Sequence, residues 1–142
     1  MRLNEETARS RLREQVHGVL CTLHPDRGPD PVPVVYAVSD DGHVGIPIDT
    51  VKPKTFSRLQ REANLAADPR GSLLIERWED DDWSRLWWVR AELRHVSDPP
   101  SSLTDDLADR LASTVPHYAD KPFHRLLVCR IVRVAGWAAG EA

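Results

Sequence analysis

The chain has 142 residues, of which 41% are hydrophobic and 29% are charged, and its formal net charge is −3. This composition is globular and allows one core, so we expect a single domain over 1–142, without general affinity for nucleic acids. No apolar run approaches the ~20 residues that span a bilayer, and the polar start is unlike a signal peptide, so we expect no membrane partner and a cytoplasmic location.

The first part of the chain predicts one helix followed by three short strands. Asn4 before EETARSRLREQV (5–16) is typical of a helix N-cap, and Gly18 ends this helix. Three apolar runs separated by turn residues then have the character of strands: GVLCTLH (18–24), PVPVVYAV (31–38) and HVGIPI (43–48). Three such strands in succession favour an antiparallel meander.

The second part alternates helices with longer strands. KTFSRLQREANLAAD (54–68) has apolar residues at helical spacing and ends at Asp68-Pro69. The remaining elements are predicted as a strand at 71–78, a long strand at 83–97, a helix at 101–114 and a final strand at 124–139. About six strands and three helices indicate a mainly β (α+β) fold, an antiparallel barrel that is closed or nearly closed.

Three of the five tryptophans lie in one segment, DDDWSRLWWVRAELRHV (80–96). In an extended strand, Trp83 and Trp87 share one face and Trp88 lies on the other. Aromatic residues on both faces favour a strand between the core and a second buried surface, a cleft or a subunit interface. We place Trp83 and Trp87 at that second surface, whereas Trp88 can equally fill the core.

The segment PIDTVKPKTFSRLQR (47–61) leaves a strand, passes through a loop and enters a helix. Lys52 and Lys54 precede the predicted helix, Thr55 lies at its cap, and Arg58 is one turn in. Cationic side chains beside the N–H groups of a helix start favour a phosphate. The alternative is a solvated basic turn.

The order of these strands, with the motifs KPKT and DPRGSLL, resembles the pyridoxamine 5'-phosphate oxidase-like split-barrel superfamily. Within it, DWSRLWWVR and the C-terminal GWAA are similar to a branch of deazaflavin (coenzyme F-420)-dependent oxidoreductases. The resemblance implies a six-stranded antiparallel split barrel of the FMN-binding type. It also implies a homodimer with two cofactor sites across the interface.

The resemblance places the cofactor on particular residues. Lys52, Lys54 and Thr55 match the basic loop that grips its phosphate, and Trp87 matches a position at the edge of the ring. Trp137 is a candidate for reaching the partner subunit's site. Two strands match those that lie along the ring: Pro33, Val34 and Val35 in one, and Pro47, Ile48 and Asp49 in the other.

The expected activity is hydride transfer between coenzyme F-420, or alternatively FMN, and a small organic molecule. The cofactor does the chemistry in such proteins, which suits a sequence without an evident acid–base constellation. The C-terminal GWAAGEA has no arginine to hold a substrate phosphate, which argues against pyridoxamine 5'-phosphate itself as the substrate. Alternatives are an FMN-dependent pyridoxamine 5'-phosphate oxidase-like enzyme, a flavin or deazaflavin carrier without turnover, and a barrel whose tryptophans bind a protein or single-stranded nucleic acid.

The remaining reactive residue types carry weaker signals. Cys21 and Cys129 lie in apolar runs and are expected to be buried free thiols. The histidines have no metal-binding spacing, so no metal site is expected, although haem ligation by a histidine is a rarer alternative. Tyr118 is interpreted as an ordinary loop aromatic, with a proton donor near a substrate as the alternative.

Overall fold

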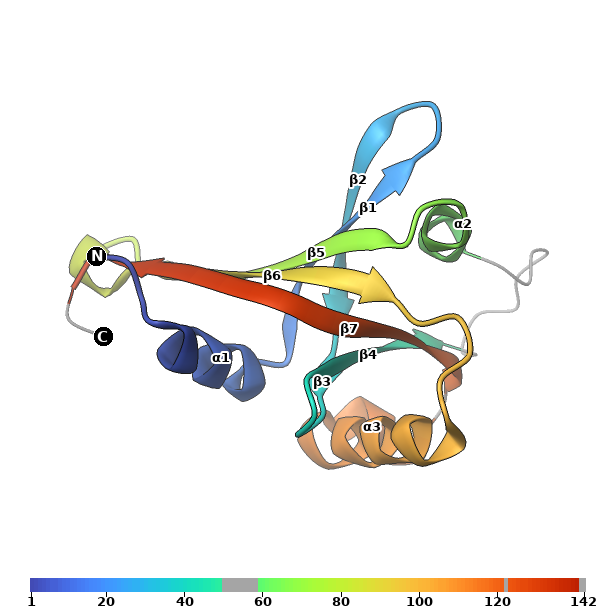
Figure 1. Cartoon of the computed structure of the whole chain (residues 1–142). Helices are drawn as coiled ribbons and strands as arrows, with labels where there is room; N and C mark the ends of the chain where they lie inside the picture. The colour runs from blue at the N-terminus through green and yellow to red at the C-terminus, as the bar shows by residue number, and fades with distance from the viewer. Residues whose placement is uncertain (50–58, 122, 141–142) are drawn as a thin grey trace.

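A seven-stranded antiparallel sheet, curled on itself, forms the body of the protein (Figure 1). The computed structural model describes residues 1–49, 59–121 and 123–140. The strands are β1 (His17–His24), β2 (Gly28–Val35), β3 (Ala37–Val38), β4 (His43–Asp49), β5 (Arg70–Arg77), β6 (Trp87–His95) and β7 (Phe123–Ala138). Their order is β2-β1-β5-β6-β7-β4-β3. The predicted mainly β (α+β) class is confirmed, but the described sheet has seven strands instead of six.

Three helices pack on this sheet, as expected. They are α1 (Glu5–Glu14), α2 (Gln60–Ala67) and α3 (Ser101–Thr114), and two short 3₁₀ turns complete the described elements, η1 (Trp83–Arg85) and η2 (Pro116–Tyr118). The helix α1 contacts β7, α2 contacts β1, and α3 contacts β3 and β4 (Figure 1). In the described residues, no helix has the length and apolar character needed to cross a membrane.

Local chemistry accounts for the ends of two helices. The side chain of Asn4 accepts a hydrogen bond from the Thr7 amide at 2.8 Å, so the predicted N-cap of α1 is confirmed. The prediction of a continuous helix over 54–68 is wrong, because Leu59 has an extended backbone and α2 begins at Gln60. Glu62 explains this start, since its carboxylate accepts a hydrogen bond from the Leu59 amide at 3.0 Å.

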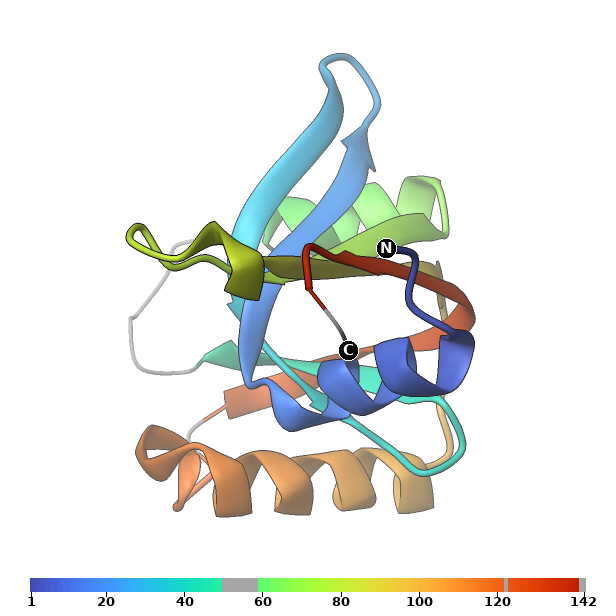
Figure 2. The same ribbon diagram turned by 90° about the vertical axis from the view of Figure 1, so that its left-hand side faces the viewer.

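The predicted strand 31–38 is broken at Tyr36 into two strands that belong to opposite edges of the sheet. β2 pairs with β1, whereas β3 pairs with β4. The chain therefore passes from one edge of the sheet to the other within a single residue, so the two edges are held close together. Figure 2 shows the result, a curled sheet that surrounds the core with α1 across its near opening.

Tyr36 is fixed at this crossing by two hydrogen bonds. Its amide donates to the Val16 carbonyl at 3.0 Å, and its hydroxyl donates to the Leu12 carbonyl at 2.6 Å. The Leu12 carbonyl lies in the last turn of α1, where carbonyls have no partner within the helix. The side chain is only 1% exposed, and burial raises the pKa of Tyr36 above its ordinary value, so it stays a neutral donor.

The predicted strand 83–97 begins only at Trp87, and this changes the placement of the tryptophans. Trp83 lies in η1, a turn capped by the side chain of Asp82, which accepts from the Ser84 amide at 3.1 Å. From Trp87 onward the strand alternates, with Trp87, Val89, Ala91 and Leu93 buried. The strand thus has one core face and one more exposed face that carries Trp88 and Arg90. The prediction that Trp83 and Trp87 share a strand face is wrong.

The core has a main part inside the curled sheet and a smaller part beneath α3. Leu107 and Leu111 of α3 are fully buried against Ala37 and Val128. Gly45 of β4 permits this approach, because a Cβ added there would lie 2.9 Å from the Cβ of Leu107.

The two cysteines differ in burial. Both are free, but only Cys129 is buried, whereas Cys21 is half-buried, so the prediction of two buried thiols is half confirmed. Burial raises the pKa of the Cys129 thiol to about 12, so this residue behaves as a small apolar side chain at neutral pH.

The crossing at Tyr36 generates a prediction about stability. We expect Tyr36→Phe to lower the free energy of unfolding by about 1–3 kcal/mol, because the buried Leu12 carbonyl loses its donor. Urea denaturation measures this loss. Ser113→Ala, which removes an exposed hydroxyl that donates to the Arg110 carbonyl of α3 at 3.2 Å, is the matched control. An equal effect of both substitutions would contradict a special role for the Tyr36 hydroxyl.

Candidate functional site

A cavity of about 290 Å³ lies between β2 and β4, where the barrel is split. We call it the split cavity. Its lining residues come from five parts of the chain: His17, Pro33, Val34, Val35, Ile46, Pro47, Arg61 and Tyr118. Four residues that the sequence places along a cofactor ring, Pro33, Val34, Val35 and Pro47, are therefore brought together around one cavity.

Prolines explain why the barrel is split here. Pro29, Pro31 and Pro33 occupy alternate positions of β2, whose pairing with β1 runs from Gly28 to Val35. Alternate residues direct their backbone N–H groups to the same side of a strand, so the three missing donors all lie on the edge away from β1. This edge of β2 cannot form a regular ladder with β4, although Tyr36 holds the two strands close together.

The polar rim of the split cavity consists of His17, Arg61 and Tyr118. Arg61 is placed by α2, which is anchored by two buried polar residues that follow Arg61 in the helix. Glu62 accepts two hydrogen bonds from Arg125, at 2.9 and 2.6 Å, and Asn64 donates to Thr22 at 2.9 Å. These contacts fix α2 against β1 and β7 and thereby fix the backbone from which Arg61 extends.

Sequence reasoning missed the rim residues. Arg61 belongs to the basic segment 47–61, but the predicted helix start drew attention to the cations before it. The sequence suggests no role for His17 beyond a metal or haem ligand and favours a loop aromatic over a proton donor for Tyr118, whereas the structure places both at the split cavity. The sequence does contain a signal for Arg61. It is the second residue of α2 after the Leu59 cap, so it is a cation at a helix start, the same pattern that predicts a phosphate site in this segment.

The other predicted site residues lie elsewhere or outside the described residues. Ile48 is buried in the core, and Asp49 ends β4. Lys52, Lys54, Thr55 and Arg58 fall outside the described residues, so their predicted grip on a phosphate stays a prediction.

The three predicted tryptophans do not line the split cavity of a single chain. Trp87 is 8% exposed in the main core, with the Arg11 guanidinium 4.8 Å from its ring centroid. Trp83 is exposed beside Trp78, with 5.2 Å between the ring centroids. Trp137 is partly exposed and pairs with Trp88 across β6 and β7. Their predicted contacts with a cofactor stay predictions.

The outward side of β1, β5, β6 and β7 carries a surface that we call the outer face, in which the apolar side chains of Val19, Leu74, Trp88 and Trp137 lie among the charged side chains of Glu76 and Arg90. Val19 lies opposite Leu74, and Trp88 lies opposite Trp137, in neighbouring strands. Val19, Leu74 and Trp137 are each 37–40% exposed. Large apolar side chains gathered on one surface are typical of an interaction site.

The chemistry of the split cavity is that of a binding site. An apolar wall formed by prolines, valines and Ile46 faces a polar rim that includes one guanidinium, which suits a flat apolar ring with an anionic substituent. Among the described residues that line it there is no carboxylate and no thiol. Within the described residues, no group of three or more His, Cys, Asp or Glu side chains is placed to hold a metal ion.

The sequence matches no protein-family model and no curated protein. Solved structures, however, share its fold. A FAD-binding protein from Mesorhizobium loti has a TM-score of 0.72 and 18% identity, with 96% of this chain and 95% of that chain covered. An FMN-binding protein from Syntrophomonas wolfei has a TM-score of 0.66 and 20% identity, covering 94% of this chain and 86% of that chain.

A third similar structure binds a different group. The heme storage protein HutZ from Vibrio cholerae has a TM-score of 0.65 and 12% identity, with 92% of this chain and 91% of that chain covered. At these identities the likenesses show the fold alone, and they confirm that the curled sheet is a split barrel.

The burial of Trp87 generates a prediction. We expect Trp87→Ala to lower the free energy of unfolding by about 3–5 kcal/mol, the usual range for truncation of a buried tryptophan. Trp83→Ala is the matched control, because that side chain is 63% exposed, and it should change the stability little. Denaturation curves of both variants give the comparison, and similar losses in the two would contradict the core placement of Trp87.

Proposed function

We propose that the protein binds a flavin or deazaflavin in the split cavity and transfers a hydride between it and a small organic molecule. The observation that carries this proposal is the apolar wall of Pro33, Val34, Val35 and Pro47 with Arg61 at its rim. Coenzyme F-420 is the first candidate, because DWSRLWWVR resembles the deazaflavin-dependent branch. FMN is the alternative, and two proteins with the same fold are described as FAD-binding and FMN-binding.

The residues present fit such a cofactor. Proline and valine side chains offer a smooth apolar surface to a planar ring, and the Arg61 guanidinium suits a phosphate. The remaining phosphate contacts are predicted to come from three basic side chains and one hydroxyl, Lys52, Lys54, Arg58 and Thr55, which lie outside the described residues. The cofactor supplies the hydride chemistry, while the protein binds and orients it and excludes water.

The size of the split cavity supports a dimeric site. Its volume of about 290 Å³ is just below the roughly 300–1,000 Å³ of small-molecule sites, which favours a site that a second copy of the chain helps to enclose. We propose a homodimer that uses the outer face as its interface. Trp137 lies on this face, and Trp83 is exposed, so both are available to reach a partner's site.

The alternative is a carrier protein that binds the same cofactor in the same cavity but catalyses no hydride transfer. Anaerobic mixing of the reduced cofactor–protein complex with candidate acceptors distinguishes the two, because only an enzyme speeds the oxidation of the cofactor. Pyridoxamine 5'-phosphate is mixed separately with the oxidised FMN complex, since an FMN-dependent oxidase would transfer a hydride from it, or from a related amine, to the oxidised flavin.

A second candidate function is haem binding, and His17 is the observation that favours it. Neutral histidine is the commonest axial ligand of haem iron, and His17 lies in the wall of the split cavity. The fold is shared with a heme storage protein. A haem titration that gives a Soret shift in the protein, and none in His17→Ala, would support haem in place of a flavin.

The proposed cofactor site is tested by titration. We expect coenzyme F-420 or FMN to quench tryptophan fluorescence on binding, and Arg61→Gln to weaken that binding by about 1.5–3 kcal/mol. Lys54→Glu, which reverses a charge in the basic loop, is expected to weaken it further. Arg27→Gln, at the far β1–β2 turn, is the control and should bind as tightly as the natural chain. Unchanged affinity in folded Arg61→Gln and Lys54→Glu would place the phosphate elsewhere.

The proposed homodimer is tested by analytical ultracentrifugation. We expect a species of twice 16.1 kDa at micromolar concentration. Leu74→Glu, which puts a charge into the outer face, is expected to shift the protein to monomer, whereas Glu6→Gln on α1 should leave the dimer intact. A stable monomer of the natural chain would exclude the shared-site arrangement.

A further inference from the structure

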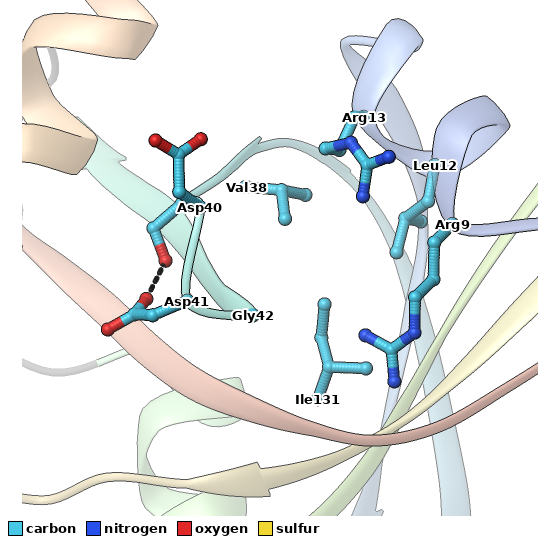
Figure 3. A pocket seen from close by; sticks show the side chains of 9 residues that line it. Arg9, Leu12, Arg13, Val38, Asp40, Asp41, Gly42 and Ile131 are labelled. Carbon is cyan, nitrogen blue, oxygen red and sulfur yellow. Dashed lines mark hydrogen bonds between the residues drawn. The ribbon is translucent and has the colours of Figure 1, made fainter. Parts of the chain in front are cut away.

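A second cavity, of about 280 Å³, lies between α1 and the turn that joins β3 to β4 (Figure 3). We call it the α1 cavity. None of its lining residues lines the split cavity, so an occupant would be a separate ligand. Its volume corresponds to roughly nine water molecules at ~30 Å³ each.

The floor of the α1 cavity is apolar. Leu12 of α1, Val38 of β3 and Ile131 of β7 direct their side chains toward its centre in Figure 3. All three belong to the main core and are 1–8% exposed. Their exposed parts form a small apolar floor, which suits the short apolar body of a ligand.

Two arginines border this floor. Arg9 and Arg13 are four residues apart on α1, so they lie on the same side of the helix. Figure 3 shows both guanidinium groups beside the cavity, one on either side of Leu12. Arg9 makes a surface ion pair with Glu5 at 3.0 Å, and such pairs give little net stabilisation, so this guanidinium can also serve a ligand. Arg13 donates to the Ser10 hydroxyl at the long distance of 3.4 Å.

The two carboxylates of the turn are directed away from the cavity and have other partners (Figure 3). Asp40 is 93% exposed and forms an ion pair with Arg110 at 3.2 Å. Asp41 accepts from the Ser39 hydroxyl and lies 2.9 Å from the His43 ring nitrogen. The hydrogen bonds from Ser39 and His43 lower the pKa of Asp41. The carboxylate therefore stays ionised at neutral pH and interacts with groups of the turn itself. The side chains that face the cavity are thus cationic or apolar.

We propose that the α1 cavity binds a small organic carboxylate, with its apolar body on Leu12, Val38 and Ile131 and its carboxylate between Arg9 and Arg13. A guanidinium offers parallel N–H donors that match a carboxylate, and two guanidinium groups one helical turn apart hold it from both sides. The apolar floor selects against inorganic anions, and the arginines select against neutral molecules of the same size.

The proposal is tested on the full chain, without added cofactor, by amide NMR at low ionic strength. Hexanoate, hexanol and inorganic phosphate are titrated separately. We expect hexanoate to shift the amides of residues 9–13 and 38–42 and to bind at least about tenfold more tightly than either of the others. Arg9→Gln and Arg13→Gln are each expected to weaken hexanoate binding by about tenfold. Arg27→Gln, in the distant β1–β2 turn, should leave it unchanged.

Three results would overturn the proposal. Equal binding of hexanol would show that the arginines contribute nothing, and equal binding of phosphate would show that the floor is not used. Unchanged hexanoate affinity in both glutamine variants, with their folds intact by NMR, would place the carboxylate elsewhere. Because no cofactor is present in this experiment, its outcome is independent of the function proposed for the split cavity.

Discussion

The crossing at Tyr36 is the constraint on which the rest of the structure depends. One residue separates a strand at one edge of the sheet from a strand at the other, so a seven-stranded sheet must curl until its edges meet. The hydroxyl of Tyr36 ties α1 to the same point through Leu12. Both cavities border this junction, the split cavity beyond Val35 and the α1 cavity beyond Val38.

The pattern of apolar and turn residues was enough to predict most elements, because half-buried strands and amphipathic helices have distinct periods. The failures have local causes. The run PVPVVYAV has the composition of one continuous strand. Nothing in it indicates that the residues before Tyr36 pair with β1 and those after it pair with β4. Trp83 reads as part of the following strand, because the cap that Asp82 provides to η1 is a contact between neighbours and leaves no periodic signal.

Only part of the candidate site could be predicted from the sequence, again because local motifs carry information that long-range contacts do not. The strand residues Pro33, Val34, Val35 and Pro47 were found by the resemblance of their motifs, and the structure brings them around one cavity. Arg61, His17 and Tyr118 come from separate segments, and their meeting depends on buried anchors such as Asn64 to Thr22, which join residues 42 positions apart. Such long-range contacts cannot be deduced from local spacing.

The alternate prolines of β2 also determine the hydrogen-bonding polarity of the split. Along the edge away from β1, Pro29, Pro31 and Pro33 present carbonyl oxygens but no N–H groups, and Val35 supplies the first donor. A molecule that lies along this edge meets acceptors almost throughout. Its matching side must therefore be rich in N–H or O–H groups, while its own acceptors have to be satisfied by the rim or by water. At the split cavity, which Pro33 lines, the backbone of β2 thus favours one hydrogen-bonding orientation for the proposed ligand.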